Sequence, residues 1–193
     1  MFTGIVDEMG KVARTRPDGL TLAIPPRMAA RLSPGGSIAV EGVCLTATAV
    51  RSGEVDADIM PETFAKTTLG SLRDGDAVNL ELPATPESLL AGHIVQGHVD
   101  GVATVAAVEE RGNSRMVSFS LSPELARYIA QKGSVAVNGV SLTVVEAAAD
   151  GFSVALIPHT RQVTTLSDLR VGSKANIETD ILAKYAEKLL ASR

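Results

Sequence analysis

Short runs of alternating apolar and polar residues, separated by glycine, proline and aspartate, fill most of the chain. In residues 20–24 the apolar side chains recur with the period of two that is typical of a half-buried β-strand. The preceding Pro17-Asp18-Gly19 has the backbone preferences of a tight turn. By the same criteria we predict strands at 2–6, 20–24, 38–40, 44–50, 55–59 and 78–82, and again at 99–108, 116–121, 135–137, 142–147, 152–157 and 175–177.

Helical periodicity is rarer. Residues 27–32 follow two prolines and residues 123–131 follow Ser122, a suitable N-cap, so both segments are predicted as short helices. Only residues 180–193 carry a long helical pattern, with Asp180 as a possible N-cap and Lys188 and Arg193 near the end that favours cations. This helix either packs on its own barrel or bundles with its copies in other subunits. Its apolar stripe consists of Ile181, Leu182, Tyr185, Leu189 and Leu190.

The chain contains two copies of one unit. Residues 4–12 align with residues 97–105, and later segments such as 37–46 and 79–81 align with counterparts 97 positions further on. The change of offset predicts a four-residue insertion in a turn near 109–114. Because the strands do not alternate with helices, each copy is expected to form a small antiparallel barrel. The predicted units are 1–86, 87–179 and a C-terminal helix at 180–193, with a linker at 83–92 between the barrels.

Composition narrows the possible functions. The net charge of −4 with scattered Lys and Arg disfavours a nucleic-acid groove, and no nucleotide-binding glycine motif occurs. Three His and one Cys show no metal-ligand spacing. Without a signal-like start or a long apolar run, and with a single Cys, the chain is expected to be cytoplasmic. Four Phe, two Tyr and no Trp imply that a flat ligand would stack on aliphatic walls, backbone or another flat ligand.

Matched positions of the two copies differ at residues that can carry protons or attack electrophiles. Small and hydroxyl-bearing residues are unchanged, which suits close backbone approach and hydrogen bonding. The pattern suggests two homologous binding sites with different tasks. The differing pairs are Cys44 and Ser141, Ile5 and His98, Glu41 and Asn138, and Glu62 and His159.

Ordinary structural roles remain open for each of these residues. Cys44 could be an inert buried thiol, and His98 could be a structural histidine. Asp180 could serve only as a helix cap. Glu62 and His159 could be solvated loop residues, and Glu41 and Asn138 could be turn residues.

Taken together, several motifs resemble the riboflavin synthase family of the alpha-subunit type. The resemblance covers nearly the whole chain and both repeats. The motifs are MFTGIV at 1–6, VEGVCLT at 40–46, PET at 61–63, GHIVQGHVDG at 92–101, VNGVSLTV at 137–144, PHT at 158–160 and NIETDILAKY at 176–185.

The resemblance implies an all-β fold of two tandem six-stranded antiparallel Greek-key barrels with a C-terminal trimerisation helix. It implies a transferase that moves a four-carbon unit between two molecules of 6,7-dimethyl-8-ribityllumazine, giving riboflavin and 5-amino-6-(D-ribitylamino)uracil. No metal or other cofactor is implied. The active site of the family lies between the first barrel of one subunit and the second barrel of a neighbour in a homotrimer, and some relatives associate with lumazine synthase.

Site residues follow from the resemblance position by position. The catalytic candidates are His98, Cys44, Ser141, Thr143 and Asp180. The first site is expected to contain Gly4, Ile5, Val6, Ser37, Cys44, Leu45, Thr46, Asp58, Ile59, Met60, Pro61, Glu62, Thr63, Gly97, His98 and Val99, with Phe2 and Thr3 from the N-terminal segment. The second is expected to contain Lys132, Ser141, Leu142, Thr143, Ala155, Leu156, Ile157, Pro158, His159 and Thr160.

Two other functions compete with this one. A non-catalytic lumazine- or flavin-binding antenna protein of the same fold would have degraded second-half motifs, whereas GHVDG, VSLTV and PHT are all present here. A flavin-binding reductase barrel would need a nicotinamide-binding domain, for which no residues remain.

Overall fold

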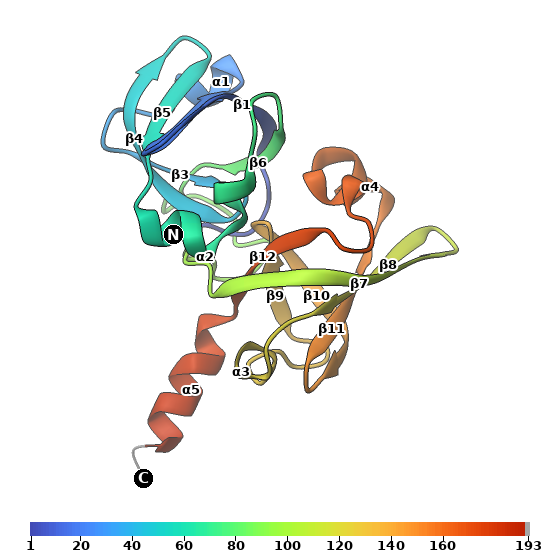
Figure 1. The fold of residues 1–193 in the computed structure, drawn as a ribbon. Coiled ribbons are helices and arrows are strands. Elements are labelled where there is room, and N and C mark those ends of the chain that lie inside the picture. Colours follow the sequence, from blue (N-terminus) through green and yellow to red (C-terminus); the bar gives the residue numbers. More distant parts are fainter. Residues whose placement is uncertain (192–193) are drawn as a thin grey trace.

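Six antiparallel strands close into a barrel in the first half of the chain (Figure 1). The structure is a computed structural model that describes residues 1–191. Around the first barrel the order is β1-β2-β5-β4-β3-β6. Since β6 returns beside β3 after the consecutive strands β3, β4 and β5, the connection is a Greek key. The strands are β1 Glu8–Arg16, β2 Gly19–Ala23, β3 Ser37–Val40, β4 Val43–Arg51, β5 Glu54–Asp58 and β6 Ala77–Glu81.

The second half repeats this barrel and ends in a helix. Its strand order is β10-β11-β8-β7-β12-β9. Read in the opposite direction around the closed barrel, this is the order of the first barrel, with β7 to β12 in place of β1 to β6. The predicted pair of Greek-key barrels with a C-terminal helix is therefore confirmed, while the division at 1–86, 87–179 and 180–193 stays a prediction. The elements are β7 Gly101–Arg111, β8 Ser114–Ser120, β9 Ser134–Val137, β10 Val140–Ala148, β11 Gly151–Leu156, β12 Lys174–Thr179 and α5 Ile181–Ala191.

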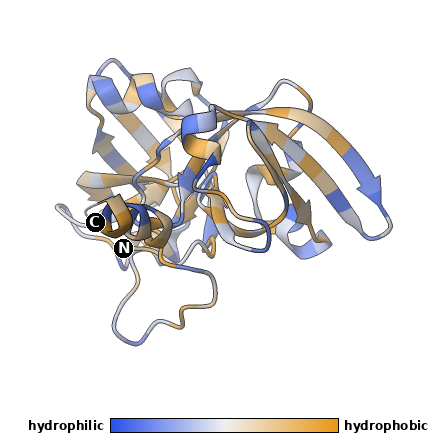
Figure 2. Ribbon diagram, turned by 90° about the horizontal axis from the view of Figure 1, so that it is seen from below, coloured by the Kyte–Doolittle hydropathy of each residue, from blue (hydrophilic) through white to orange (hydrophobic). Residues whose placement is uncertain are grey.

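Alternation of side chains fills each barrel with its own core. In β4 the side chains of Val43, Leu45 and Ala47 are buried, whereas Thr46 and Thr48 are exposed. Figure 2 shows the same alternation of hydrophobic and hydrophilic residues along the strands. Each barrel contains a separate cluster of buried aliphatic residues, so each half can bury a core of its own. Within residues 1–191, no helix combines the length and the apolarity needed to cross a membrane.

Strand register confirms the predicted insertion. Lys11 pairs with Ala23 in the first barrel and Thr104 pairs with Ser120 at the matched place in the second. The β7–β8 hairpin then continues for two additional pairs, ending at Arg111 and Ser114, which accounts for the four extra residues. Both copies also carry a bulge at the matched place of this hairpin. The insertion therefore lengthens a hairpin tip and leaves the barrel unchanged.

The predicted strand at 2–6 is wrong. Only Phe2 pairs, through a single bridge to Val95. The backbone N–H groups of Thr3 and Gly4 donate instead to the carboxylate of Glu81, at 2.7 and 3.1 Å. A backbone whose donors bind a side chain has none left for a strand ladder at these positions, so the segment crosses the molecule as an extended connection.

Two predicted helices are shorter than expected, and four short helical segments were missed. The helix at 27–32 is α1 Pro26–Ala29 and that at 123–131 is α3 Pro123–Ala126, where the Ser122 side chain caps no N–H group. The loops that contain PET and PHT are helical, because each begins with proline at the first helical position. The missed segments are α2 Pro61–Lys66, the 3₁₀ turn Thr68–Ser71, α4 Pro158–Val163 and the 3₁₀ turn Thr165–Asp168.

The C-terminal helix α5 is attached to the second barrel by its polar side. Lys184 pairs with Asp100, and the hydroxyl of Tyr128 donates to Glu187. The Oδ1 of Asp180 accepts the N–H of Leu182 at 3.0 Å, as expected near a helix start. Arg193, predicted near the helix end, lies outside the described residues.

The two barrels are joined by reciprocal hydrogen bonds that are related by an approximate twofold axis. The side-chain amide of Asn79 donates to the carbonyl of Asn138, and that of Asn176 donates to the carbonyl of Glu41, at 3.0 and 2.8 Å. Asn79 also accepts the N–H of Thr165. In the matched bond, the side-chain oxygen of Asn176 accepts the N–H of Thr68 in the first copy. Every one of these contacts joins one copy to the other.

One acidic side chain breaks the symmetry of this interface. Glu41 is buried where its counterpart is Asn138, and it accepts the N–H of Asn79 and the hydroxyl of Thr165 at 2.7 and 3.0 Å. Burial raises the pKa of Glu41 from its ordinary 4.5 to about 7, although the Asn79 N–H and the neighbouring hydrogen bonds act in the opposite direction. The folded protein therefore binds a proton here more tightly than the unfolded chain does.

The first prediction concerns this proton. The stabilising contribution of protonated Glu41 is complete below pH 4.5 and is lost as the pH rises to about 7. In Glu41→Gln, a neutral mimic of the acid, unfolding free energy should exceed that of the wild type above pH 7 by up to about 3 kcal/mol and match it near pH 4. Urea unfolding at several pH values measures this difference. The exposed Glu87→Gln is the control, and a pH-independent difference between Glu41→Gln and wild type would contradict the account.

Candidate functional site

The first candidate site is a pocket of about 360 Å³ beside β4. Its walls come from the start of β4, from Met60 and α2, and from a segment of the second copy that crosses to the first barrel. Cys44 is half-buried and the side chain of His98 is exposed. The lining residues are Val43, Cys44, Met60, Glu62, Thr63, Lys66, Thr67, Gly97, His98 and Val99.

The second candidate site is a smaller pocket of about 120 Å³ at the matched place on the second barrel. It is formed by the start of β10, by α4, and by a segment of the first copy. It shares no residue with the first pocket. The lining residues are Gly4, Ile5, Val6, Val140, Ser141, His159, Thr160, Val163 and Thr164.

The two copies therefore exchange a short segment. The N–H of Cys44 donates to the carbonyl of Gly97, and the N–H of Ser141 donates to that of Gly4, at 2.8 and 2.7 Å. The family resemblance predicted residues 4–6 in the first site. The structure places them against Ser141 in the second, because the chain crosses from one barrel to the other between Gly4 and β1.

Glycine is required at both crossings. The φ angles of Gly4 and Gly97 are +75° and +79°, a region that side chains disfavour. A Cβ atom on Gly97 would lie 2.6 Å from the Cβ of Cys44, and one on Gly4 would lie 2.6 Å from that of Ser141. These two glycines thus allow the backbone of one copy to form a wall of the pocket on the other copy.

The pockets lie at matched places on the two barrels but differ in size and in chemistry. The first presents Cys44, His98 and Glu62, with Lys66 from the end of α2. At matched positions the second presents Ser141, Ile5 and His159, with Val163. The first pocket is therefore the more polar and charged, and the second is the more apolar. Two copies of one ligand would meet different reactive groups in them.

His93, which was not among the predicted site residues, contacts Ser141. The Nδ1 atom of His93 lies 2.7 Å from the Oγ of Ser141, and His93 is only 8% exposed. Its Nε2 has no hydrogen-bond partner among the described residues. Burial lowers the pKa of His93, while the charge of Asp180 acts in the opposite direction. A largely desolvated, neutral imidazole in this position can take a proton from the serine hydroxyl.

Comparison of the two copies could not have found His93, because its matched position would precede residue 1. The available signal was the GHIVQGH motif itself, which places two histidines around the crossing segment. The structure separates them: His98 lines the first pocket, and His93 contacts Ser141 in the second.

Several predicted site residues lie outside both pocket linings. The side chains of Leu45, Ile59, Leu142 and Leu156 fill the barrel cores, so any part in binding would fall to their backbone. Phe2 is buried between the barrels with Val95, and Asp58 pairs with Arg16 on the surface. The others outside the linings are Thr3, Ser37, Thr46, Pro61, Lys132, Thr143, Ala155, Ile157, Pro158 and Asp180. Within residues 1–191, no group of three or more His, Cys, Asp or Glu is arranged to hold a metal ion.

Comparison with known proteins establishes the family. The lumazine binding domain family matches residues 3–83 and 96–180, one match for each barrel. A riboflavin synthase of Mycobacterium bovis is 45% identical, with 100% of this chain and 99% of the relative covered. Riboflavin synthases of Actinobacillus pleuropneumoniae and Bacillus subtilis are 40% and 38% identical, covering 100% and 98% of this chain and 91% and 90% of the relatives. The chain belongs to the riboflavin synthase family.

Solved structures of the same fold belong to proteins that bind lumazine or flavin. LumP complexed with 6,7-dimethyl-8-(1'-D-ribityl) lumazine superposes with a TM-score of 0.83 at 26% identity. LumP complexed with riboflavin superposes with a TM-score of 0.84 at 29% identity. Each comparison covers 93% of this chain and 99% of LumP.

The second prediction tests the surroundings of His93. In Asp180→Asn the imidazolium loses a favourable charge while its burial is unchanged, so the pKa of His93 should fall further. NMR titration of the imidazole protons measures this shift, and with only three histidines in the chain the assignment is simple. The exposed Asp150→Asn serves as the control. An unchanged His93 titration in Asp180→Asn would show that Asp180 does not act on the imidazole.

Proposed function

We propose that this protein catalyses the dismutation of two 6,7-dimethyl-8-ribityllumazine molecules to riboflavin and 5-amino-6-(D-ribitylamino)uracil. The observation that carries the proposal is the pair of matched pockets with different reactive groups. A reaction between two identical molecules, in which one donates a four-carbon unit and the other accepts it, requires such a pair. The names of the relatives and the lumazine and flavin complexes of LumP support the same substrate class.

The two pockets would act together across a subunit junction. Since they share no lining residue, two lumazines bound to one chain would occupy separate sites. In a homotrimer the first pocket of one subunit would face the second pocket of its neighbour, and the two ring systems would stack. Stacking of substrates on each other suits a chain with few aromatic side chains. Holding both in attack geometry can contribute about 7–11 kcal/mol to catalysis.

Proton transfer in the first pocket is assigned to His98. The methyl group on position 7 of the lumazine ring is acidic because its anion delocalises into the heterocycle, so a weak, well-placed base suffices. His98 is the basic side chain that the second copy contributes to this pocket. Cys44, in the same lining, is the candidate for addition to the electrophilic ring carbon.

In the second pocket we assign activation of the nucleophile to Ser141 and His93. The contact between Oγ and Nδ1 at 2.7 Å gives the serine an adjacent base, and Asp180 adds a negative charge that stabilises the imidazolium formed. Thr143 would orient the second lumazine. The remaining substrate-binding residues are those predicted from the resemblance, grouped by pocket as described above. Operation without a cofactor and association with lumazine synthase stay predictions.

A non-catalytic antenna protein remains the second candidate, because the neighbouring LumP structures are complexes with lumazine and flavins. The second pocket argues for catalysis. A binding protein has no need of a buried histidine in contact with a serine, and both groups are present here.

The third prediction separates these two functions. The purified protein should convert lumazine into one riboflavin for every two lumazines consumed. Ser141→Ala and His98→Gln should lower the single-turnover rate by a factor of roughly 10² or more, the usual contribution of general acid–base catalysis. Lumazine absorbance and riboflavin fluorescence report both quantities. Ser122→Ala, which alters an exposed serine that caps nothing, is the matched control. Tight lumazine binding without riboflavin would favour the antenna function.

The fourth prediction concerns assembly. Leu182, Tyr185 and Leu190 on α5 are 58%, 54% and 67% exposed, while the polar side of the helix is attached to the second barrel. A bundle of three such helices would cover them, so sedimentation should give three times the mass of the chain. Leu182→Glu with Leu190→Glu should yield monomers, and the exposed Lys188→Ala should not. A wild-type monomer would contradict the proposed junction.

A further inference from the structure

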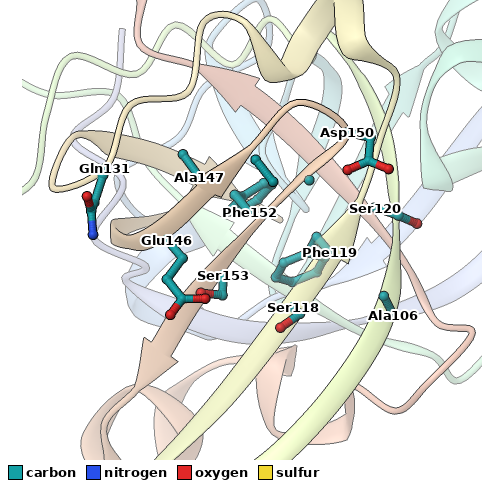
Figure 3. Close-up of a pocket in the computed structure, with 12 residues that line it drawn as sticks. Ala106, Ser118, Phe119, Ser120, Gln131, Glu146, Ala147, Asp150, Phe152 and Ser153 are labelled. Carbon is teal, nitrogen blue, oxygen red and sulfur yellow. The ribbon is translucent and has the colours of Figure 1, made fainter.

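A hollow of about 590 Å³ opens on the second barrel, and none of its lining residues lines either candidate pocket (Figure 3). It lies over β7, β8, β10 and β11 and is bounded by the turn that joins the last two. Glu146 and Asp150 stand at its edges, and the stacked rings of Phe119 and Phe152 form its apolar part. The other lining residues are Ala106, Ser118, Ser120, Gln131, Ala147, Ala148, Gly151 and Ser153.

At the matched place the first barrel carries an ion pair of its own. Nη1 of Arg51 donates to Oδ2 of Asp56 at 2.7 Å, and the hydroxyl of Thr21 donates to Oδ1 of the same carboxylate at 2.7 Å. Strand register places Asp56 opposite both Thr21 and Ala49. A guanidinium, a carboxylate and a hydroxyl thus form a row across three adjacent strands.

The second barrel retains this row without its cation. Ser153 lies opposite Ser118 on one side and Glu146 on the other, in the register that joins Asp56 to Thr21 and Ala49. The carboxylate has moved one strand sideways, from the Asp56 position to Glu146. Ala148 occupies the position of Arg51 and lines the hollow, so no side chain of the second barrel takes the place of the arginine.

A buried polar atom in this row has no partner. Ser153 is 4% exposed, and its Oγ forms no hydrogen bond with the described residues. Buried hydroxyl groups are nearly always hydrogen-bonded. The matched atom in the first barrel belongs to Asp56, which receives two donors. Ser153 therefore marks the place where a donor is expected from outside the barrel.

We propose that this hollow binds a guanidinium group supplied by another molecule, in the place where the first barrel uses its own Arg51. Glu146 supplies the carboxylate, the hydroxyl groups of Ser153 and Ser118 accept further N–H groups, and Asp150 adds negative charge at the opposite edge. A planar guanidinium with five donors matches several acceptors in fixed positions better than an ammonium group does. The proposal does not depend on the activity of the two candidate pockets.

Calorimetric titration of the full-length protein with L-argininamide tests the proposal. Saturable binding is expected, with weaker binding of L-lysinamide. Glu146→Gln should weaken argininamide binding by about tenfold, the loss expected for one charge-assisted hydrogen bond. Ala148→Arg introduces the arginine of the first copy and should abolish binding while raising the melting temperature. Glu124→Gln, an exposed glutamate outside the hollow, should bind like the wild type.

Sedimentation of the same proteins identifies the source of the guanidinium. If an arginine of a second copy fills the hollow, Ala148→Arg and excess argininamide will both weaken self-association. If the source is a free small molecule, argininamide will bind and self-association will be unchanged. The proposal is overturned if argininamide does not bind and Ala148→Arg leaves self-association intact. Equal affinities in wild type, Glu146→Gln and Ala148→Arg would overturn it as well.

Discussion

The contact on which the rest of the structure depends is the close approach of two tight turns, at Gly42 and Gly139, near the approximate twofold axis. Gly42 and Gly139 approach so closely that a Cβ atom on Gly42 would lie 2.5 Å from the backbone nitrogen of Gly139. Around them, the side chains of Asn79 and Asn176 each bond to the backbone of the opposite copy. No larger residue fits at Gly42 or Gly139. The buried side-chain amides of Asn79 and Asn176 find their hydrogen-bond partners only when both barrels are present. Two barrels of modest size thereby become one interlocked unit.

This interlocking fixes what each pocket can contain. Glu81 and Glu178 each hold the crossing segment of their own copy by matched bonds to backbone N–H groups. The carbonyl groups of Gly4 and Gly97 in these segments then accept N–H groups from the barrel of the other copy. A residue that differs between the two crossing segments therefore changes the pocket on the barrel of the other copy. The segment with His98 supplies the first barrel, and the segment with Ile5 supplies the second. The exchange thus turns one duplicated site into two chemically different ones.

Most of the fold could be predicted from the sequence, because alternation and repetition are local signals. Strand patterns located the described strands other than β1 Glu8–Arg16, which was not predicted. The change of offset located the longer hairpin that ends at Arg111 and Ser114. The helices after Pro61 and Pro158 were missed because six residues show too little periodicity to be distinguished from loops. The strand at 2–6 was wrong because the partner of its N–H groups, Glu81, is 77 or 78 residues away.

The site was less predictable for a similar reason. Motifs identified Cys44, His98 and Ser141, but no sequence pattern shows that a segment crosses to the other barrel. The pairing of His93 with Ser141 arises only from that crossing, since the two residues are 48 positions apart. Long-range contacts of this kind depend on topology, which alternation of side chains does not encode.

Complementation between two impaired variants tests the central claim most directly. One variant would carry Cys44→Ser and His98→Gln in the first pocket, and the other Ser141→Ala in the second. If the pockets cooperate across subunits, unfolding and refolding the two together should restore riboflavin formation well above either variant alone, because mixed junctions then contain two intact pockets. A mixture no more active than its components, despite demonstrated subunit exchange, would contradict the account.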